Sequence, residues 1–183
     1  YPDGRTKKPH LSTWRDGWRH LRFLLMYAPH WLFLFPGLFM IMGSAILLPL
    51  LIFYPVHLGN VNFGVHTILY LAVFLQAGIQ FLFFYLIVKS YAFYHNFLPL
   101  KKFEKKIIEM FSLEKGLMAG VPVFLAGIIL SVLNLLYWKQ ANFGDLDPAE
   151  FMRQVIPAVT FLFTGIQIIV SSFIVGIIKH KNL

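Results

Sequence analysis

The stretch VIPAVTFLFTGIQIIVSSFIVGII, residues 155–178, decides the fold class of this chain. It carries no charge, and it exceeds the roughly 20 apolar residues that a helix needs to cross a bilayer. Three similar uncharged runs precede it, at residues 31–54, 67–88 and 116–138. The chain has 183 residues, of which 58% are hydrophobic. Too little polar sequence remains to cover four apolar helices, which excludes a soluble fold. We therefore expect an all-α integral membrane protein with four transmembrane helices, spanning residues 31–183.

Two further segments have the pattern of amphipathic helices. In residues 14–30, Trp14, Trp18, Leu21 and Leu25 recur at helical spacing, and a row of arginines lies beside them. Residues 100–114 combine an apolar face with four lysines in the run KKFEKK. Such segments are typical of helices that lie in the membrane interface, with aromatic rings among the headgroups and cations near the phosphates. We predict two interfacial helices, one before the first span and one between the second and third.

The distribution of lysine and arginine predicts the topology. Six precede the first span, six lie from Lys89 to Lys115 and two follow the last span, whereas the other two connections hold none and two. Positive residues remain on the cytoplasmic side of a membrane. Both termini and the central connection are therefore expected to be cytoplasmic.

Composition restricts the chemistry of the chain. The absence of cysteine excludes disulfides, thiolate metal sites and a cysteine nucleophile. The net charge of +8, beside hydrophobic spans, favours anionic lipid rather than nucleic acid as the partner. The pair Asp145 and Asp147 resembles a metal-binding D-x-D motif, but Asp147 followed by Pro148 also reads as a helix N-cap with proline at the first helical position, which we favour. We predict no catalytic and no metal-binding residue in the chain.

Two groups of cations are candidates for phosphate binding. The first lies in the turn-rich residues 1–13, where two cations flank a hydroxyl and could hold a phosphate. The alternative interpretation of these residues is a solvated linker. The second lies on the helix at 14–30, where the cations meet either ordinary headgroups or one specific lipid phosphate. The candidates are Arg5 and Lys7 in the first group, and Arg15, Arg19, Arg22 and His20 in the second.

Several polar side chains lie within the spans. Polar groups in a bilayer seek partners inside the helix bundle, so they either join helices through hydrogen bonds or line a substrate path. They are Gln76, Gln80, Asn134 and Gln167.

Three stretches together resemble a known family. They are TWRDGWRHLRFLLMYAPHWLFLFPG (13–37), FSLEKGL (111–117) and FGDLDPAEFMRQVIPAVTFLFTGIQIIVSSFIVGI (143–177). They are similar to the C-terminal membrane region of bacterial family 2 glycosyltransferases of the dolichol-phosphate-mannose-synthase type. The resemblance implies a multi-pass protein of the bacterial inner (cytoplasmic) membrane.

The resemblance also implies a function and partners. In this family an upstream GT-A domain binds a nucleotide sugar and a divalent metal, and transfers the sugar to a polyprenyl phosphate that the membrane part positions. Gly4-Arg5-Thr6-Lys7 resembles a family loop that reads Gly-x-Ser-Lys and lies near the phosphates, with Thr6 in place of the serine. The chain begins at Tyr1, and a GT-A domain is missing from it. Residues 1–13 are therefore expected to be a linker from that domain. We expect no cofactor in the membrane part itself. A homo-oligomer is compatible with this interpretation.

Two other functions fit the hydropathy equally well. One is a small four-span protein that translocates a lipid-linked sugar, and the other is a plain membrane anchor or assembly subunit without lipid selectivity. A complete carrier is expected to begin with Met close to its first span. Mutation of the three arginines at 14–30 would distinguish a plain anchor from a lipid-presenting domain.

Overall fold

The computed structural model describes residues 13–54, 56–58, 61–95 and 101–180. Its elements are, in order, α1 (Thr13–Tyr27), the π-helix η1 (His30–Leu34), α2 (Phe35–Phe53), β1 (Val56–Leu58), β2 (Val61–Phe63), α3 (Val65–Tyr94), α4 (Lys102–Met110), α5 (Leu113–Gln140) and α6 (Pro148–His180). Within these described ranges, four helical segments are long and apolar enough to cross a membrane, namely His30–Phe53, Val65–Tyr94, Leu113–Gln140 and Pro148–Lys179. The predicted all-α, four-span fold class is confirmed.

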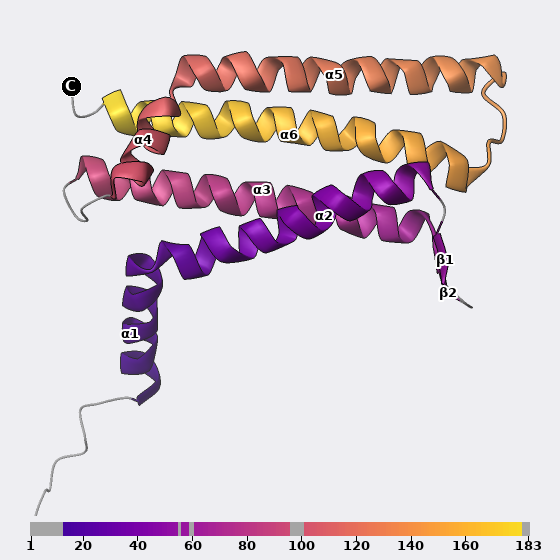
Figure 1. The fold of residues 1–183 in the computed structure, drawn as a ribbon. Coiled ribbons are helices and arrows are strands. Elements are labelled where there is room, and N and C mark those ends of the chain that lie inside the picture. The colour runs from indigo at the N-terminus through magenta and orange to yellow at the C-terminus, as the bar shows by residue number, and fades with distance from the viewer. Residues whose placement is uncertain (1–12, 55, 59–60, 96–100, 181–183) are drawn as a thin grey trace, which may run out of the picture.

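The four spans lie side by side in a row (Figure 1). Contacts join α5 to α6, α6 to α3, and α3 to α2. Large apolar side chains remain exposed along the row, including Phe39 on α2 and Met118 on α5, at 81% and 76% of their surface. Apolar surface on this scale is unusual for a water-soluble monomer, and it suits contact with lipid.

Glycine allows the closest approach within the row, between α5 and α6. A side-chain carbon added to Gly127 would lie 2.6 Å from the backbone nitrogen of Leu162, and one added to Gly165 would lie 2.6 Å from the backbone nitrogen of Phe124. Small residues at a helix interface let two backbones pack closely, which is a main source of helix association in lipid.

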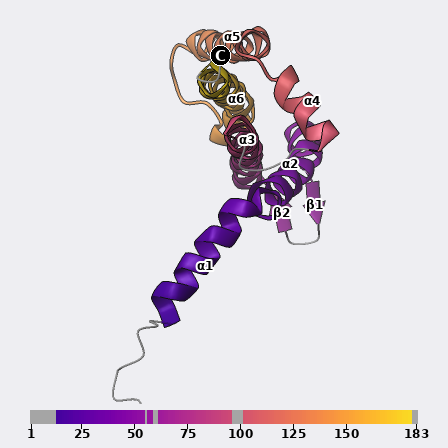
Figure 2. The same ribbon diagram turned by 90° about the vertical axis from the view of Figure 1, so that its left-hand side faces the viewer.

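The two amphipathic segments are both helical, but they are placed differently. α1 ends at Tyr27, just before Pro29, and projects crosswise from one end of the row (Figures 1 and 2). α4 packs at the same end, against α3 and η1, and is shorter than the predicted 100–114. The C-terminal end of α6 also lies there (Figure 1). The three lysine- and arginine-rich regions therefore share one end of the bundle, as the charge distribution requires.

The connection at residues 55–66, which holds neither lysine nor arginine, contains the antiparallel pair β1 and β2. Val56 lies opposite Phe63, and Leu58 opposite Val61. It lies at the end of the bundle opposite α1 (Figure 1). At this end Arg153 of α6 donates a hydrogen bond of 2.6 Å to the carbonyl of Leu51 in the last turn of α2, where a cation stabilises the exposed carbonyls.

The Asp145–Asp147 segment precedes α6 in the way that the capping interpretation predicts. The backbone N–H of Ala149 donates to Asp147 Oδ1 at 3.1 Å, and α6 begins at Pro148. An N-cap side chain that accepts from the second helical residue satisfies one of the unpaired donors of the first turn. This confirms the role of Asp147 as a cap.

Candidate functional site

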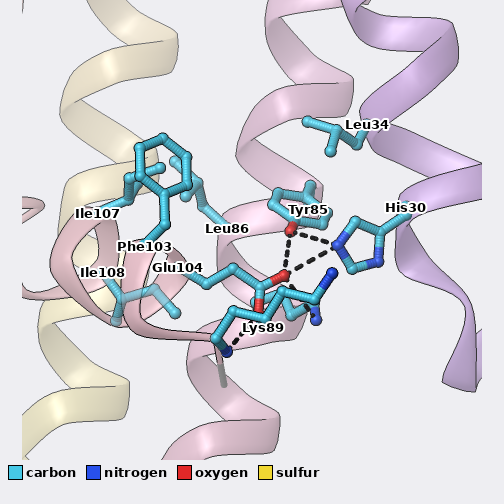
Figure 3. Close-up of a pocket in the computed structure, with 10 residues that line it drawn as sticks. His30, Leu34, Tyr85, Leu86, Lys89, Phe103, Glu104, Ile107 and Ile108 are labelled. Atoms are coloured by element: carbon cyan, nitrogen blue, oxygen red, sulfur yellow. Dashed lines mark hydrogen bonds and ion pairs between the residues drawn. The ribbon is translucent and has the colours of Figure 1, made fainter.

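A cavity of about 250 Å³ lies at the α1 end of the bundle, between η1, the last third of α3, and α4 (Figure 3). One wall is polar and the other is apolar. His30, Tyr85, Lys89 and Glu104 meet on the polar side (Figure 3). The apolar wall consists of Leu34, Leu86, Phe103, Ile107 and Ile108. A site of this kind suits a ligand with a charged end and a hydrocarbon body.

The centre of the polar wall is a buried ion pair. Lys89 Nζ lies 3.1 Å from Glu104 Oε1, and the two side chains are only 8% and 9% exposed. The Tyr85 hydroxyl donates to the same oxygen at 2.9 Å. Removing two charges from water is costly unless further hydrogen bonds accompany the ion pair, and Glu104 Oε1 receives them.

His30 completes the group, and the geometry fixes its tautomer. His30 Nε2 lies 2.9 Å from Glu104 Oε1 and 3.0 Å from the Tyr85 hydroxyl oxygen. Because Tyr85 uses its single proton on Glu104, an unprotonated Nε2 would face two acceptors. Nε2 therefore carries a proton and donates, so Glu104 Oε1 receives hydrogen bonds from three side chains.

The second carboxylate oxygen of Glu104 accepts a hydrogen bond at the start of its own helix, α4. The backbone N–H of Lys101 donates to Glu104 Oε2 at 3.0 Å, which is the arrangement of an acidic residue in a first helical turn. Burial acts to raise the pKa of the Glu104 carboxyl, but the hydrogen bonds from Lys101, Lys89 and Tyr85 and the charge of Lys89 outweigh it and lower the pKa to about 2. Glu104 is consequently an anion at neutral pH.

Local sequence explains how each side chain reaches the site. Tyr85 and Lys89 are four residues apart on α3 and so share a helix face. Glu104 and Ile108 have the same spacing on α4, and they are its buried residues. His30 opens the π-helical turn η1, a wide turn that occurs often at functional sites.

Sequence reasoning did not identify this group. The sequence pattern predicts the lysine-rich run at residues 101–106 as the polar side of an interfacial helix, and it counts Lys89 only among the cations of the central connection. Two signals were present: Glu104 is a single acid between two lysine pairs, and Lys89 follows Tyr85 by one turn at the end of an apolar run.

The predicted cationic candidates lie elsewhere. Arg5 and Lys7 fall outside the described residues. Arg15, Arg19 and His20 are exposed on α1 and do not line the cavity, and the Arg22 backbone belongs to α1, although its side chain is outside the description. Their role as headgroup or lipid-phosphate ligands stays a prediction.

Three of the four predicted intramembrane polar residues join helices. Gln76 Nε2 of α3 donates to the carbonyl of Thr160 at 2.8 Å and to Thr164 Oγ1 at 3.0 Å, both on α6. Gln167 Nε2 donates to the carbonyl of Gln76 at 3.4 Å, and Asn134 Nδ2 of α5 donates to the carbonyl of Gln154 at 3.2 Å. The remaining residue, Gln80, is half-buried and lies outside this network. Among the described residues, the side-chain oxygens of Gln76 and Gln167 are buried without a hydrogen-bond donor.

Comparison with known proteins identifies the family. Residues 86–179, just over half of the chain, match the family described as the glycosyltransferase family 2 C-terminal transmembrane region. The chain is also similar to the low-salt glycan biosynthesis hexosyltransferase Agl6 of Haloferax volcanii, with 31% identity over 174 residues; this covers 94% of the chain and 40% of the relative. No solved structure matches the chain. The chain belongs to the family of glycosyltransferase family 2 C-terminal transmembrane regions.

Proposed function

We propose that this chain is the membrane part of a glycosyltransferase and presents a polyprenyl phosphate to a catalytic domain that uses a nucleotide sugar. One observation carries the proposal: a cavity with an ionic wall and an apolar wall lies between η1, α3 and α4, at the end of the bundle from which α1 projects. A polyprenyl phosphate has a charged head on a long hydrocarbon chain, so it needs both kinds of surface at the depth of the headgroups.

The surroundings of the cavity support this choice of acceptor. Trp14 and Trp18 of α1 are 86% and 55% exposed, and Arg15 and Arg19 are exposed beside them. α1 lies crosswise to the spans (Figure 1), so in a membrane it would lie along the surface with its rings among the headgroups. By the positive-inside rule, this surface would be the cytoplasmic face of the cytoplasmic membrane.

The catalytic chemistry is assigned to a domain outside this chain. The chain spans 40% of the length of the relative that it matches, which is a hexosyltransferase. A GT-A domain with its own divalent metal would supply sugar activation, and a second copy of the chain is a further candidate partner.

Selective lipid binding tests the proposal. The chain, purified in detergent, would be titrated with a polyprenyl phosphate and with the matching polyprenol, and bound lipid would be counted by native mass spectrometry. We expect the phosphate to be retained about tenfold more tightly, a difference of about 1.4 kcal/mol. Equal retention of the two lipids would instead favour a plain anchor without lipid selectivity. Preferential retention of a polyprenyl-linked sugar over the free phosphate would favour the translocating carrier.

A further inference from the structure

The hydrogen bonds that converge on Glu104 come from a different part of the fold than Glu104 itself. His30, Tyr85 and Lys89 belong to the first two spans, whose packing fixes their positions. Glu104 belongs to α4, a separate helix of nine residues. The donors therefore form a cradle that is anchored in the bundle, whereas the acceptor lies on a short helix outside the spans.

The cradle is chemically suited to a phosphate. Its donors are one ammonium, one imidazole N–H and one phenolic hydroxyl, all within 3.1 Å of a single oxygen. A phosphate monoester offers three strong acceptor oxygens and a charge of about −1.5 to −2 at neutral pH, more than the single charge of a carboxylate. Lys101 also lines the cavity, so the site holds more cationic side chains than the one carboxylate balances.

The apolar wall defines the rest of the ligand. Leu34 and Leu86 face the cavity from the spans, and Phe103 and Ile107 face it from α4 (Figure 3). An inorganic anion would leave this wall without a partner. A hydrocarbon chain attached to the phosphate would cover Leu34 and Leu86, which stay with the spans when α4 moves.

We propose that Glu104 occupies the phosphate cradle in the free protein, and that the terminal phosphate of a long-chain lipid displaces it and releases α4 from α3 and η1. Because the ligand is the polyprenyl phosphate inferred above, this inference rests on the proposed function. It adds that the acceptor lipid opens its own site by exchanging one anion for another.

The small size of α4 makes such an exchange feasible. An isolated helix of nine residues is marginal in water, so α4 depends on its contacts with the bundle. Glu104 and Ile108 are its buried residues, and Phe103 and Met110 are 73% and 56% exposed. Loss of the Glu104 contacts removes most of the polar attachment of α4.

The absence of cysteine allows a direct test. Spin labels on Lys106→Cys of α4 and Phe39→Cys of α2, both exposed positions, would report the distance between these helices in nanodiscs by pulsed electron resonance. We expect a polyprenyl phosphate to shift the distance to longer values. The matching polyprenol and inorganic phosphate at the same concentration are expected to leave it unchanged, because each supplies only half of the ligand.

Two matched variants isolate the carboxylate. Glu104→Gln removes the charge and keeps the shape, so we expect the longer distance without any lipid. Glu109→Gln makes the same change on the same helix, at a side chain that is 57% exposed and lies 3.8 Å from Lys105, and it should behave like the unmodified chain. The lipid titration of the unmodified chain does not depend on either variant folding correctly.

The outcomes separate this inference from the proposed function. If native mass spectrometry detects selective binding of the polyprenyl phosphate while the label distance stays constant, the anion exchange is wrong and the proposed function stands. If no selective binding occurs, the proposed function fails, and the exchange fails with it. Two further results would overturn the exchange. One is a longer label distance with inorganic phosphate alone. The other is the same label distance in Glu104→Gln as in Glu109→Gln.

Discussion

The helices α1 and α4 have similar sequence patterns and different environments. Both combine an apolar face with several cations, and both lie at the same end of the bundle. On α1 the apolar side chains Trp14 and Trp18 are exposed, whereas α4 is attached to the spans through the buried Glu104 and Ile108. The difference depends on one acidic residue that meets a cation from another helix. Amphipathic periodicity therefore predicts that a helix has two faces, but it does not predict what each face contacts.

The largest expected effect at neutral pH is loss of the α4 attachment in Glu104→Gln. Removing one partner of a buried ion pair typically costs about 3 kcal/mol, which corresponds to an increase of about a hundredfold in opening of α4. Hydrogen exchange of the α4 amides, measured by mass spectrometry in nanodiscs, checks this, and the α1 amides serve as the internal reference. If α4 exchange does not change, the ion pair does not hold this helix.

The apolar face of α1 provides the converse experiment. The double substitution Trp14→Ala and Trp18→Ala removes exposed rings that would otherwise enter the headgroup region. Without the two rings, the association of α1 with the membrane should weaken by about 2 kcal/mol. We therefore expect the α1 amides to exchange about thirtyfold faster in nanodiscs, while exchange of the α4 amides stays the same. Equal exchange with and without the two rings would show that α1 does not lie in the interface.

Acid should loosen α4 without affecting the cations of α1. The pKa of Glu104 is lowered from 4.5 to about 2 in the folded chain, so the stabilisation is complete above pH 4.5 and is lost as the pH falls toward 2. Between these limits opening should increase about tenfold for each pH unit. The label distance between α4 and α2 measures the opening, and Glu104→Gln should abolish this pH dependence. A pH dependence that persists in this variant would assign it to another group.

The smallest effect is expected for a single cation of α1. Arg19→Gln should weaken the association of α1 with anionic lipid by about 1 kcal/mol, or about fivefold, measured as α1 exchange in nanodiscs with phosphatidylglycerol. The effect should shrink in nanodiscs of neutral lipid and at high salt, because salt screens exposed charges. The same change in neutral and anionic lipid would exclude a headgroup contact for Arg19.

The sequence alone determined the four spans, because a helix must satisfy its own backbone and carry about 20 apolar residues to cross lipid. It also determined the N-cap at Asp147, since a cap depends on neighbouring residues. It did not reveal the strands β1 and β2, whose three-residue length gives too little periodicity to detect.

Only the tertiary structure decided the candidate site. His30 lies 74 residues from Glu104 in the sequence, and Tyr85 lies 19 residues from it. No local pattern links residues so far apart, and their meeting depends on how α2, α3 and α4 pack. The cavity and its ion pair arise because the row of spans brings η1 beside α3, and because the face of α4 that carries Glu104 turns inward rather than toward the lipid.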